Sequence, residues 1–150
     1  MEVFRISKAD YADKLSSSGS ANRWNKNGQI VIYTGSSRSL STLELIVHRG
    51  SVAPRIEYKV MVISIADNDN LIKQVLTSNL PENWRKMSAY PALQTIGSKW
   101  YESQETLILK VPSAIIPNEY NFVINTEHPE FSKNVKLVRI EEYFWDARLF

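Results

Sequence analysis

With 150 residues, 43% of them hydrophobic and 23% charged, the chain has the length and composition of one soluble globular domain. The formal net charge of +2 neither implies nor excludes a nucleic-acid partner, and the lack of cysteine excludes disulfides and thiolate metal sites. No apolar run approaches the roughly 20 residues of a membrane span and the N-terminus lacks the apolar core of a signal peptide, so we expect one domain, residues 1–150, in a reducing cytoplasm.

The first third of the chain predicts two strands and a helix around a polar loop. Residues 2–6 predict a short strand, and a helical turn over 10–15 and a Gly/Ser-rich loop over 16–23 follow it. The β-branched and aromatic residues of 30–33 are typical of a buried strand. Apolar residues at helical spacing predict a helix over 41–49.

The middle of the chain predicts a buried strand followed by helical segments. Residues 58–66 are apolar at nearly every position, which predicts a central strand. A turn over 67–70 leads into a predicted short helix over 71–76, and an irregular segment containing Trp84 follows. Pro91 is expected near the start of a further helix, because proline is favoured in the first helical turn.

The last third predicts strands. Segments 106–111 and 120–124 are separated by prolines, which prevent a continuous ladder, and 135–140 alternates as a half-exposed strand does. Between them, 125–134 predicts a loop with one helical turn around Pro129. Strands outnumber helices and do not alternate with them, so we expect an α+β fold with a mixed or antiparallel sheet and peripheral helices.

Glu44 and His48 are the first candidates for chemistry. Four residues apart on a helix, they would share one face. The run Ser41 to Glu44 also matches a capping box, in which Glu44 would bond to the first helical amide, and Gly50 would then end the helix as its C-cap. On pattern alone the capping interpretation is favoured. A lone Glu-x-x-x-His lacks a third ligand and predicts no metal site.

Three other side chains are candidates for binding an anion or a flat ring. Arg23, at a loop-to-strand junction, is suited to phosphate, although stacking on Trp24 would explain it equally well. Tyr33 could stack on a ring or be ordinary core, and Ser113 follows an apolar strand. The sequence has no G-x-S-x-G, G-x-G-x-x-G or Walker motif. The residues alone therefore predict an α+β domain with a candidate anion site.

Ten short strings occur together along the sequence, from about residue 3 to its last residues. They are Val3 to Ile6, Arg23-Trp24-Asn25 with Gly28, Tyr33-Thr34, Leu43 to His48, Leu80-Pro81-x-x-Trp84, Ile96-Gly97-x-x-Trp100, Val111 to Pro117, Asn121 to Asn125, His128-Pro129 and Asp146 to Phe150. On these strings the chain resembles the RES domain, the toxin of a bacterial toxin–antitoxin pair.

The resemblance implies a single compact domain similar to the diphtheria-toxin-like ADP-ribosyltransferases. It implies NAD+ as the substrate, with no separate cofactor and no metal. Members of the family hydrolyse or phosphorolyse NAD+, or transfer its ADP-ribose to a protein, and so arrest growth. The expected partner is a cognate antitoxin with an Xre-like DNA-binding domain that blocks the pocket, in a homodimer or hetero-oligomer, with no membrane or direct nucleic-acid contact by the toxin.

The arginine, glutamate and serine that name the RES domain match Arg23, Glu44 and Ser113. The resemblance implies that Glu44 stabilises the oxocarbenium-like sugar formed when the nicotinamide bond breaks, or orients the attacking group. Arg23 would hold the pyrophosphate, Tyr33 would line the nicotinamide site, and Ser113 would bind the ribose or the carboxamide. The further implied NAD+-binding positions are Arg5, Ser37, Ser39, His48 and Asn125.

Some alternatives stay open on the sequence. Whether Arg38 points at phosphate or at solvent is undecided, as is the choice among hydrolase, phosphorylase and transferase. An RNA-binding or RNA-cleaving toxin would use His48, Glu44 and the basic-aromatic segments, and it would show salt-dependent RNA binding. A non-catalytic interaction module would use Glu44 only as a helix cap.

Overall fold

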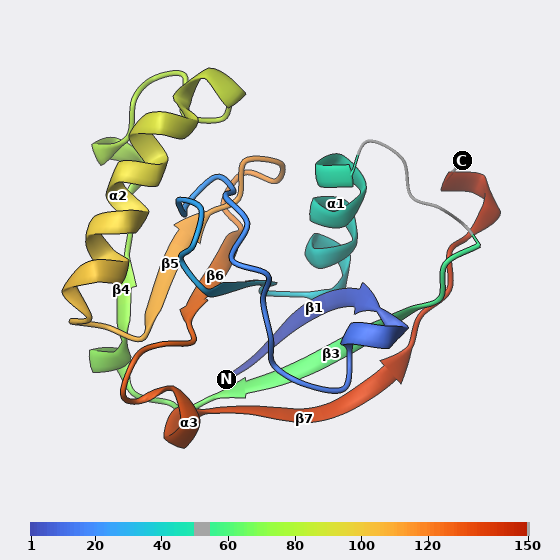
Figure 1. Ribbon diagram of the computed structural model, residues 1–150. Coiled ribbons are helices and arrows are strands. Elements are labelled where there is room, and N and C mark those ends of the chain that lie inside the picture. The colour runs from blue at the N-terminus through green and yellow to red at the C-terminus, as the bar shows by residue number, and fades with distance from the viewer. Residues whose placement is uncertain (50–54, 150) are drawn as a thin grey trace.

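Seven strands and three helices, joined by short 3-10 segments, make up the computed structural model, which describes residues 1–49 and 55–149 (Figure 1). The strands are β1 (Glu2–Lys8), β2 (Val31–Gly35), β3 (Tyr58–Ile65), β4 (Ile72–Gln74), β5 (Ile108–Pro112), β6 (Tyr120–Asn125) and β7 (Val135–Glu142). The helices are α1 (Arg38–Arg49), α2 (Tyr90–Ser103) and α3 (Phe131–Asn134). Within the described ranges no helix is both long and apolar enough to cross a bilayer.

The strands form one mixed sheet in the order β4-β5-β6-β2-β1-β3-β7. The pairing of β4 with β5 is parallel, and the other pairings are antiparallel. β1 joins β2 only through the partners Phe4 and Gly35, so the sheet consists of two halves that meet at one residue pair. The predicted α+β fold with a mixed sheet is confirmed.

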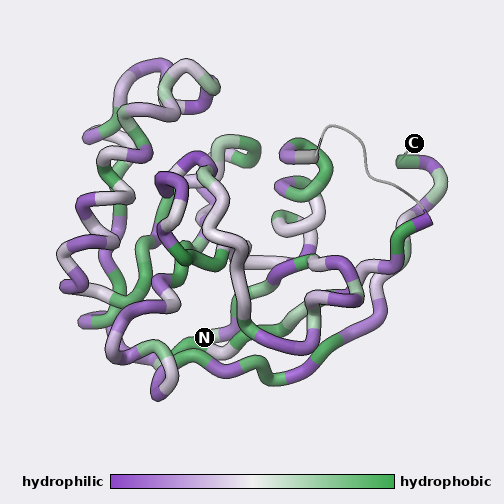
Figure 2. The backbone as a smooth tube through the Cα atoms, viewed as in Figure 1, coloured by the Kyte–Doolittle hydropathy of each residue, from purple (hydrophilic) through white to green (hydrophobic). Residues whose placement is uncertain are grey.

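The two halves of the sheet pack their inner faces together around the largest apolar cluster. This cluster takes Ile32, Ile108 and Ile124 from one half and Met61 and Ile63 from the other, all essentially inaccessible to solvent. β3 is paired on both sides and buried at six of its eight positions, as its continuous apolar sequence predicts. The edge strand β7 mixes apolar and polar residues (Figure 2), and most of its residues are exposed.

The two longer helices cover the outer faces of the two halves. α1 lies against β1 and β3, where Leu45 and Ile46 pack on Phe4, Val60 and Val62. Figure 1 shows α2 alongside the other half, next to β4 and β5. Its residues Leu93 and Trp100 pack there with Val31, Leu109 and Val123.

Two predicted elements differ from the structure. The predicted helix over 71–76 is wrong: Asp69–Leu71 is a 3-10 turn, and Ile72–Gln74 is the edge strand β4, because pairing with β5 satisfies its backbone. α1 begins at Arg38, three residues before the predicted start at Ser41.

The earlier start of α1 rules out the predicted capping box. The Ser37 hydroxyl accepts a hydrogen bond from the Leu40 amide at 3.0 Å, as an N-cap does. The Ser41 amide, which Glu44 would have capped, already donates to the Ser37 carbonyl at 3.1 Å. Glu44 therefore lies inside the helix with its carboxylate available for another role. The predicted C-cap Gly50 lies outside the described residues.

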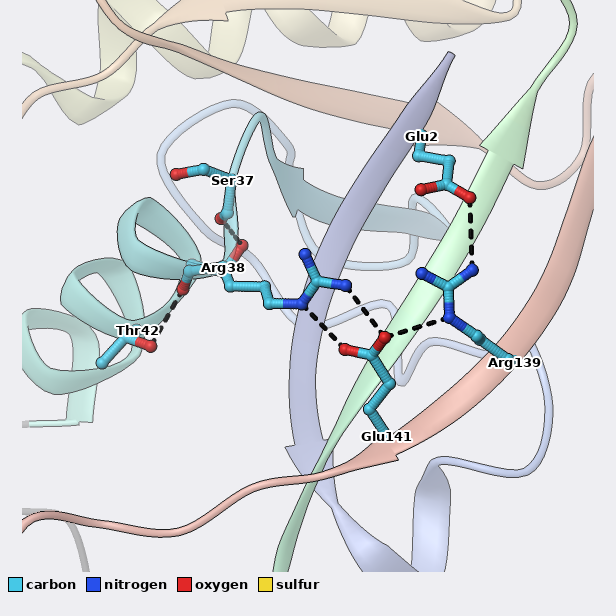
Figure 3. Close-up of polar contacts among 7 residues, drawn as sticks. Glu2, Ser37, Arg38, Thr42, Arg139 and Glu141 are labelled. Atoms are coloured by element: carbon cyan, nitrogen blue, oxygen red, sulfur yellow. Dashed lines mark hydrogen bonds and ion pairs between the residues drawn. The ribbon is translucent and has the colours of Figure 1, made fainter.

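Charged side chains tie the start of α1 to β7 (Figure 3). Nε and Nη2 of Arg38 donate to the two carboxylate oxygens of Glu141 at 2.8 and 2.9 Å, and the Arg38 guanidinium stacks on the Phe4 ring. Arg139 donates to Glu141 at 3.0 Å and to Glu2 at 3.3 Å. Arg38 thus points toward β7, where Glu141 holds it.

Acid should remove the contribution of Glu141 to stability. Hydrogen bonds from Arg38, then from Arg139, lower the pKa of Glu141 from 4.5 to about 2 in the folded chain. A lowered folded-state pKa stabilises the fold above the unfolded-state value, and this stabilisation is lost as the pH falls from about 4.5 toward 2. We expect Glu141→Gln to be less stable than wild type at pH 7 and equal to it near pH 2 in urea unfolding. A stability difference that is the same at both pH values would contradict this assignment.

Candidate active site

Residues 22–25 form a turn that carries Arg23, the arginine turn. The hydroxyl of Tyr33 fixes this turn to β2. This hydroxyl accepts a hydrogen bond from the Trp24 amide at 3.0 Å and donates to Oδ1 of Asn25 at 2.7 Å. Burial raises the pKa of Tyr33 far above its ordinary value, so the hydroxyl remains a neutral donor. Tyr33 therefore positions the arginine turn through its hydroxyl group.

Helix α2 holds the same turn from the outside. Nε2 of Gln94 donates to the Asn22 carbonyl at 2.9 Å, and Nε2 of Gln29 donates to the Ser98 hydroxyl at 2.7 Å. A Cβ atom built on Gly97 would lie 1.7 Å from the Trp24 carbonyl oxygen, so only glycine fits there. Two of the strings noted in the sequence thus meet in space, and their contact sets the position of Arg23.

The Arg23 side chain is held by two carbonyls from the segment before α2 and by the ring of Tyr90, the first residue of α2. Its Nη1 donates to the carbonyls of Trp84 at 3.0 Å and Arg85 at 3.2 Å, and its guanidinium lies 4.8 Å from the centre of the Tyr90 ring. Among the described residues no partner is found for its Nε or Nη2. The guanidinium is thus fixed by Nη1, and its other donors can bind an anion.

A second group of side chains surrounds Glu44. Its Oε1 accepts hydrogen bonds from the Ser113 hydroxyl at 3.1 Å and from Nδ2 of Asn121 at 2.6 Å. Its other oxygen, Oε2, has no hydrogen-bond partner within the described residues, and the side chain is half-buried. The carboxylate is therefore oriented through one oxygen and presents the other.

The Ser113 hydroxyl is fully occupied by the protein. It accepts hydrogen bonds from the amides of Ile115 and Ile116, both at 3.1 Å, while it donates to Glu44. Ser113 is 2% exposed, at the point where β5 turns toward β6. In this arrangement the hydroxyl orients Glu44, and the turn after β5 fixes the hydroxyl.

The pairing of β2 with β6 places the two groups on one face of the sheet. Tyr33 is opposite Val123, and Gly35 is opposite Asn121. Residues directly opposite in a ladder, and residues two apart on a strand, point to the same face. Tyr33 and Asn121 are therefore diagonal neighbours, at a spacing of about 7–8 Å. The structure brings together Arg23, Tyr33, Glu44 and Ser113, the four principal predicted residues.

The other predicted binding residues lie around or away from this group. Ser37 caps α1, Ser39 is exposed in its first turn, and His48 is exposed one turn after Glu44. Arg5 donates to the Ser16 carbonyl at 3.0 Å, and it points to the face of β1 opposite Phe4, away from α1. Of these four residues, His48 follows Glu44 by one turn on the same face of α1.

Asn125 lies at the far end of β6 from Asn121, about 13 Å away along the strand. It is completely buried, where it accepts a hydrogen bond from the Glu127 amide at 2.9 Å and donates to the Tyr101 carbonyl at 3.4 Å. In this position the side chain joins the end of β6 to α2, and the structure does not bring it to Glu44.

Two residues of the site had no role in the interpretation of the sequence: Asn121 and Tyr90. An amide on the same strand face as buried Val123 was a usable signal for Asn121, because a polar side chain on an apolar face requires a partner. The position of Tyr90, just before Pro91, gave no comparable signal.

Tyr33→Phe should loosen the arginine turn. The substitution leaves the Trp24 amide and Oδ1 of Asn25 without the hydroxyl that they share. Losing these partners in a largely buried place costs about 1–3 kcal/mol. We expect a correspondingly lower free energy of unfolding in urea and weaker binding of any anionic ligand at Arg23. Tyr11→Phe, at an exposed position, is the matched control, and equal stability of the two variants would contradict the role of the hydroxyl.

The assembled side chains define what the site can do chemically. A fixed guanidinium can bind an anionic group, and neighbouring aromatic rings can line a flat ligand. One carboxylate oxygen, presented from a half-buried position, can stabilise a positive charge that develops on a bound molecule. The combination suits a ligand that is anionic at one end and becomes cationic at its reacting centre.

Comparisons with known proteins identify the family of the chain. Residues 2–146 match the RES domain. The chain is 35% identical over 142 residues to "Prs ADP-ribosylating toxin" of Sphingobium sp. (strain YBL2), covering 92% of this chain and 88% of that protein. It is 35% identical over 127 residues to "Toxin Res" of Yersinia enterocolitica, covering 85% and 82%, and 30% identical over 153 residues to "Toxin Res" of Photorhabdus laumondii, covering 99% and 97%. The chain therefore belongs to the RES domain family.

Proposed function

We propose that this protein is a bacterial toxin that cleaves the nicotinamide–ribose bond of NAD+. The observation that carries the proposal is the Glu44 carboxylate, fixed through Oε1 by Ser113 and Asn121 and presenting Oε2. Glu44 lies at the same face of the sheet as Tyr33 and the arginine turn. An aromatic ring and a guanidinium near the carboxylate suit the flat base and the phosphates of a dinucleotide. The toxin names of three relatives support the growth-arresting role.

Each side chain has a distinct part in the proposed reaction. Arg23 binds the pyrophosphate with the donors that Trp84 and Arg85 do not occupy. Tyr33, whose hydroxyl is hydrogen-bonded to the arginine turn, lines the nicotinamide site. As the glycosidic bond lengthens, positive charge develops on the ribose and Oε2 of Glu44 stabilises it. NAD+ is the substrate, and nicotinamide leaves as a neutral base, so no further cofactor is required.

Three acceptors can complete the reaction: water, phosphate or a protein side chain. They share the bond-breaking step and differ in which nucleophile enters after nicotinamide leaves. Transfer to a protein is the second candidate function, and the name of the Sphingobium relative, "Prs ADP-ribosylating toxin", favours it. We further propose a cognate antitoxin with an Xre-like DNA-binding domain as the partner, because an uninhibited NAD+ consumer would harm its own cell.

The test is nicotinamide release from NAD+ by purified protein, with and without phosphate. Release of nicotinamide supports the proposal; ADP-ribose as the second product indicates hydrolysis, and its 1-phosphate indicates phosphorolysis. Release only after addition of cell extract, with label from NAD+ on a protein, indicates transfer. The proposal is wrong if NAD+ remains intact under all three conditions and cells expressing the Glu44→Gln variant grow like cells expressing the wild-type protein.

A further inference from the structure

The amide of Asn121 has one atom whose hydrogen bonding is unsatisfied. Its Nδ2 donates to Oε1 of Glu44 at 2.6 Å, which fixes the orientation of the amide, because a carboxylate oxygen only accepts. Its Oδ1 is inaccessible to solvent and has no hydrogen-bond partner among the described residues. Nearly all buried polar atoms in folded proteins have a partner, so an exception beside a candidate catalytic carboxylate requires an explanation.

The backbone does not account for this acceptor. Asn121 is paired in the middle of the sheet, with Gly35 on one side and Val111 on the other. Its side chain is directed to the sheet face of Tyr33 and Val123. The nearby hydroxyl of Ser113 is occupied by Glu44 and two amides, so it cannot serve Oδ1. The missing donor must therefore come from outside this group of side chains.

We infer that Oδ1 of Asn121 accepts a hydrogen bond from a hydroxyl of the ribose that carries nicotinamide, so that Asn121 binds the substrate and orients Glu44 at once. This inference rests on the proposed function. Oδ1 and Nδ2 share one carbon, so Oδ1 lies close to the carboxylate that acts on the reacting sugar carbon. The substrate groups adjacent to that carbon are the ribose hydroxyls, and a hydroxyl is a donor that Oδ1 lacks.

Asn121 should have a higher free energy in the empty site than in the site with bound substrate. A buried acceptor without a partner destabilises the empty site, and a substrate hydroxyl that bonds to Oδ1 removes that penalty. Asn121 as a residue is half-buried although Oδ1 is covered, so a small side-chain shift admits the hydroxyl. A site built to bond a hydroxyl discriminates strongly against an analogue without it.

The test compares NAD+ with two analogues that lack the 2′- or the 3′-hydroxyl of the nicotinamide ribose. For each protein variant, kcat/KM for NAD+ is divided by kcat/KM for the analogue. Because intrinsic reactivity of the analogue is common to all variants, it cancels when these ratios are compared. We expect the ratio of one analogue to be about tenfold or more higher in wild type than in Asn121→Ala.

Ser113→Ala is the matched control. Both substitutions remove one hydrogen bond to Oε1 of Glu44, but only Asn121→Ala also removes Oδ1. We expect Ser113→Ala to lose activity and to keep the wild-type ratio. Asn121→Val, which also removes both polar atoms of the amide, replaces the alanine variant if that variant does not fold.

Two results would overturn the inference, and they differ in what they say of the proposed function. If wild type cleaves NAD+ and its ratios equal those of Asn121→Ala for both analogues, Asn121 only positions Glu44 and the function stands. If wild type neither binds nor cleaves NAD+, both the function and the Asn121 assignment are wrong.

Discussion

Gly97→Ala is expected to destabilise the protein and displace Arg23, although alanine is the better helix former. In an exposed helical position this substitution would stabilise by about 1 kcal/mol. Here the new Cβ would lie 1.7 Å from the Trp24 carbonyl oxygen and 2.7 Å from its carbonyl carbon. Both atoms belong to the backbone, so α2 and the arginine turn must move apart, and such overpacking costs about 1–3 kcal/mol or more.

The measurement for Gly97→Ala is urea unfolding together with NAD+ binding. Because the Nη1 contacts of Arg23 depend on the same turn, we expect ligand affinity to fall with stability. Lys99→Ala, at an exposed position two residues later in α2, is the control and should leave both unchanged. A Gly97→Ala protein as stable as wild type, with unchanged affinity, would show that the two elements are free to separate.

Glu44→Gln is expected to lower kcat by about a hundredfold or more while the fold keeps its stability. The amide oxygen of glutamine can still accept from Ser113 and Asn121, so the local hydrogen bonds survive. What is lost is the negative charge that stabilises the developing cation, and one such electrostatic interaction in a preorganised site contributes about 10²–10³ in rate. Nicotinamide release under saturating NAD+ measures the effect.

Two comparisons separate charge from structure in the Glu44 experiment. Glu44→Ala removes the acceptor for Ser113 and Asn121 and should lose stability as well as activity. Glu105→Gln, an exposed carboxylate in the segment after α2, should change neither. If Glu44→Gln keeps wild-type kcat, Glu44 is not the group that stabilises the transition state.

The sequence predicted the strands well because their apolar patterns were unambiguous. Residues 58–66 read as a fully buried strand, and β3 has neighbours on both sides. The prediction for 71–76 was wrong because a strand of three residues is too short to show a hydrophobic periodicity. Ile72–Gln74 is a strand because it pairs with β5. The start of α1 was misplaced because Ser37 and Ser41 are both acceptable caps by type.

The sequence named four residues of the candidate site but not how they connect, and it gave no role to Asn121 or Tyr90. Arg23, Tyr33, Glu44 and Ser113 came from a resemblance, which gives residues and no distances. That the Tyr33 hydroxyl holds the arginine turn depends on the close approach of segments that only the fold brings together. The orientation of Glu44 by Asn121 likewise follows from the register of β2 and β6.

The order in which the chain is synthesised has a consequence for the cell. Glu44 lies on α1, and its two hydrogen-bond donors follow it by 69 and 77 residues. Contacts between residues so distant in sequence form late, because the loop between them must first be closed. A ribosome that is still translating β5 therefore carries a nascent chain with no assembled site. Under the proposed function, the nascent chain cannot cleave NAD+ during most of translation. An antitoxin already present in the cell therefore has that time to bind the toxin.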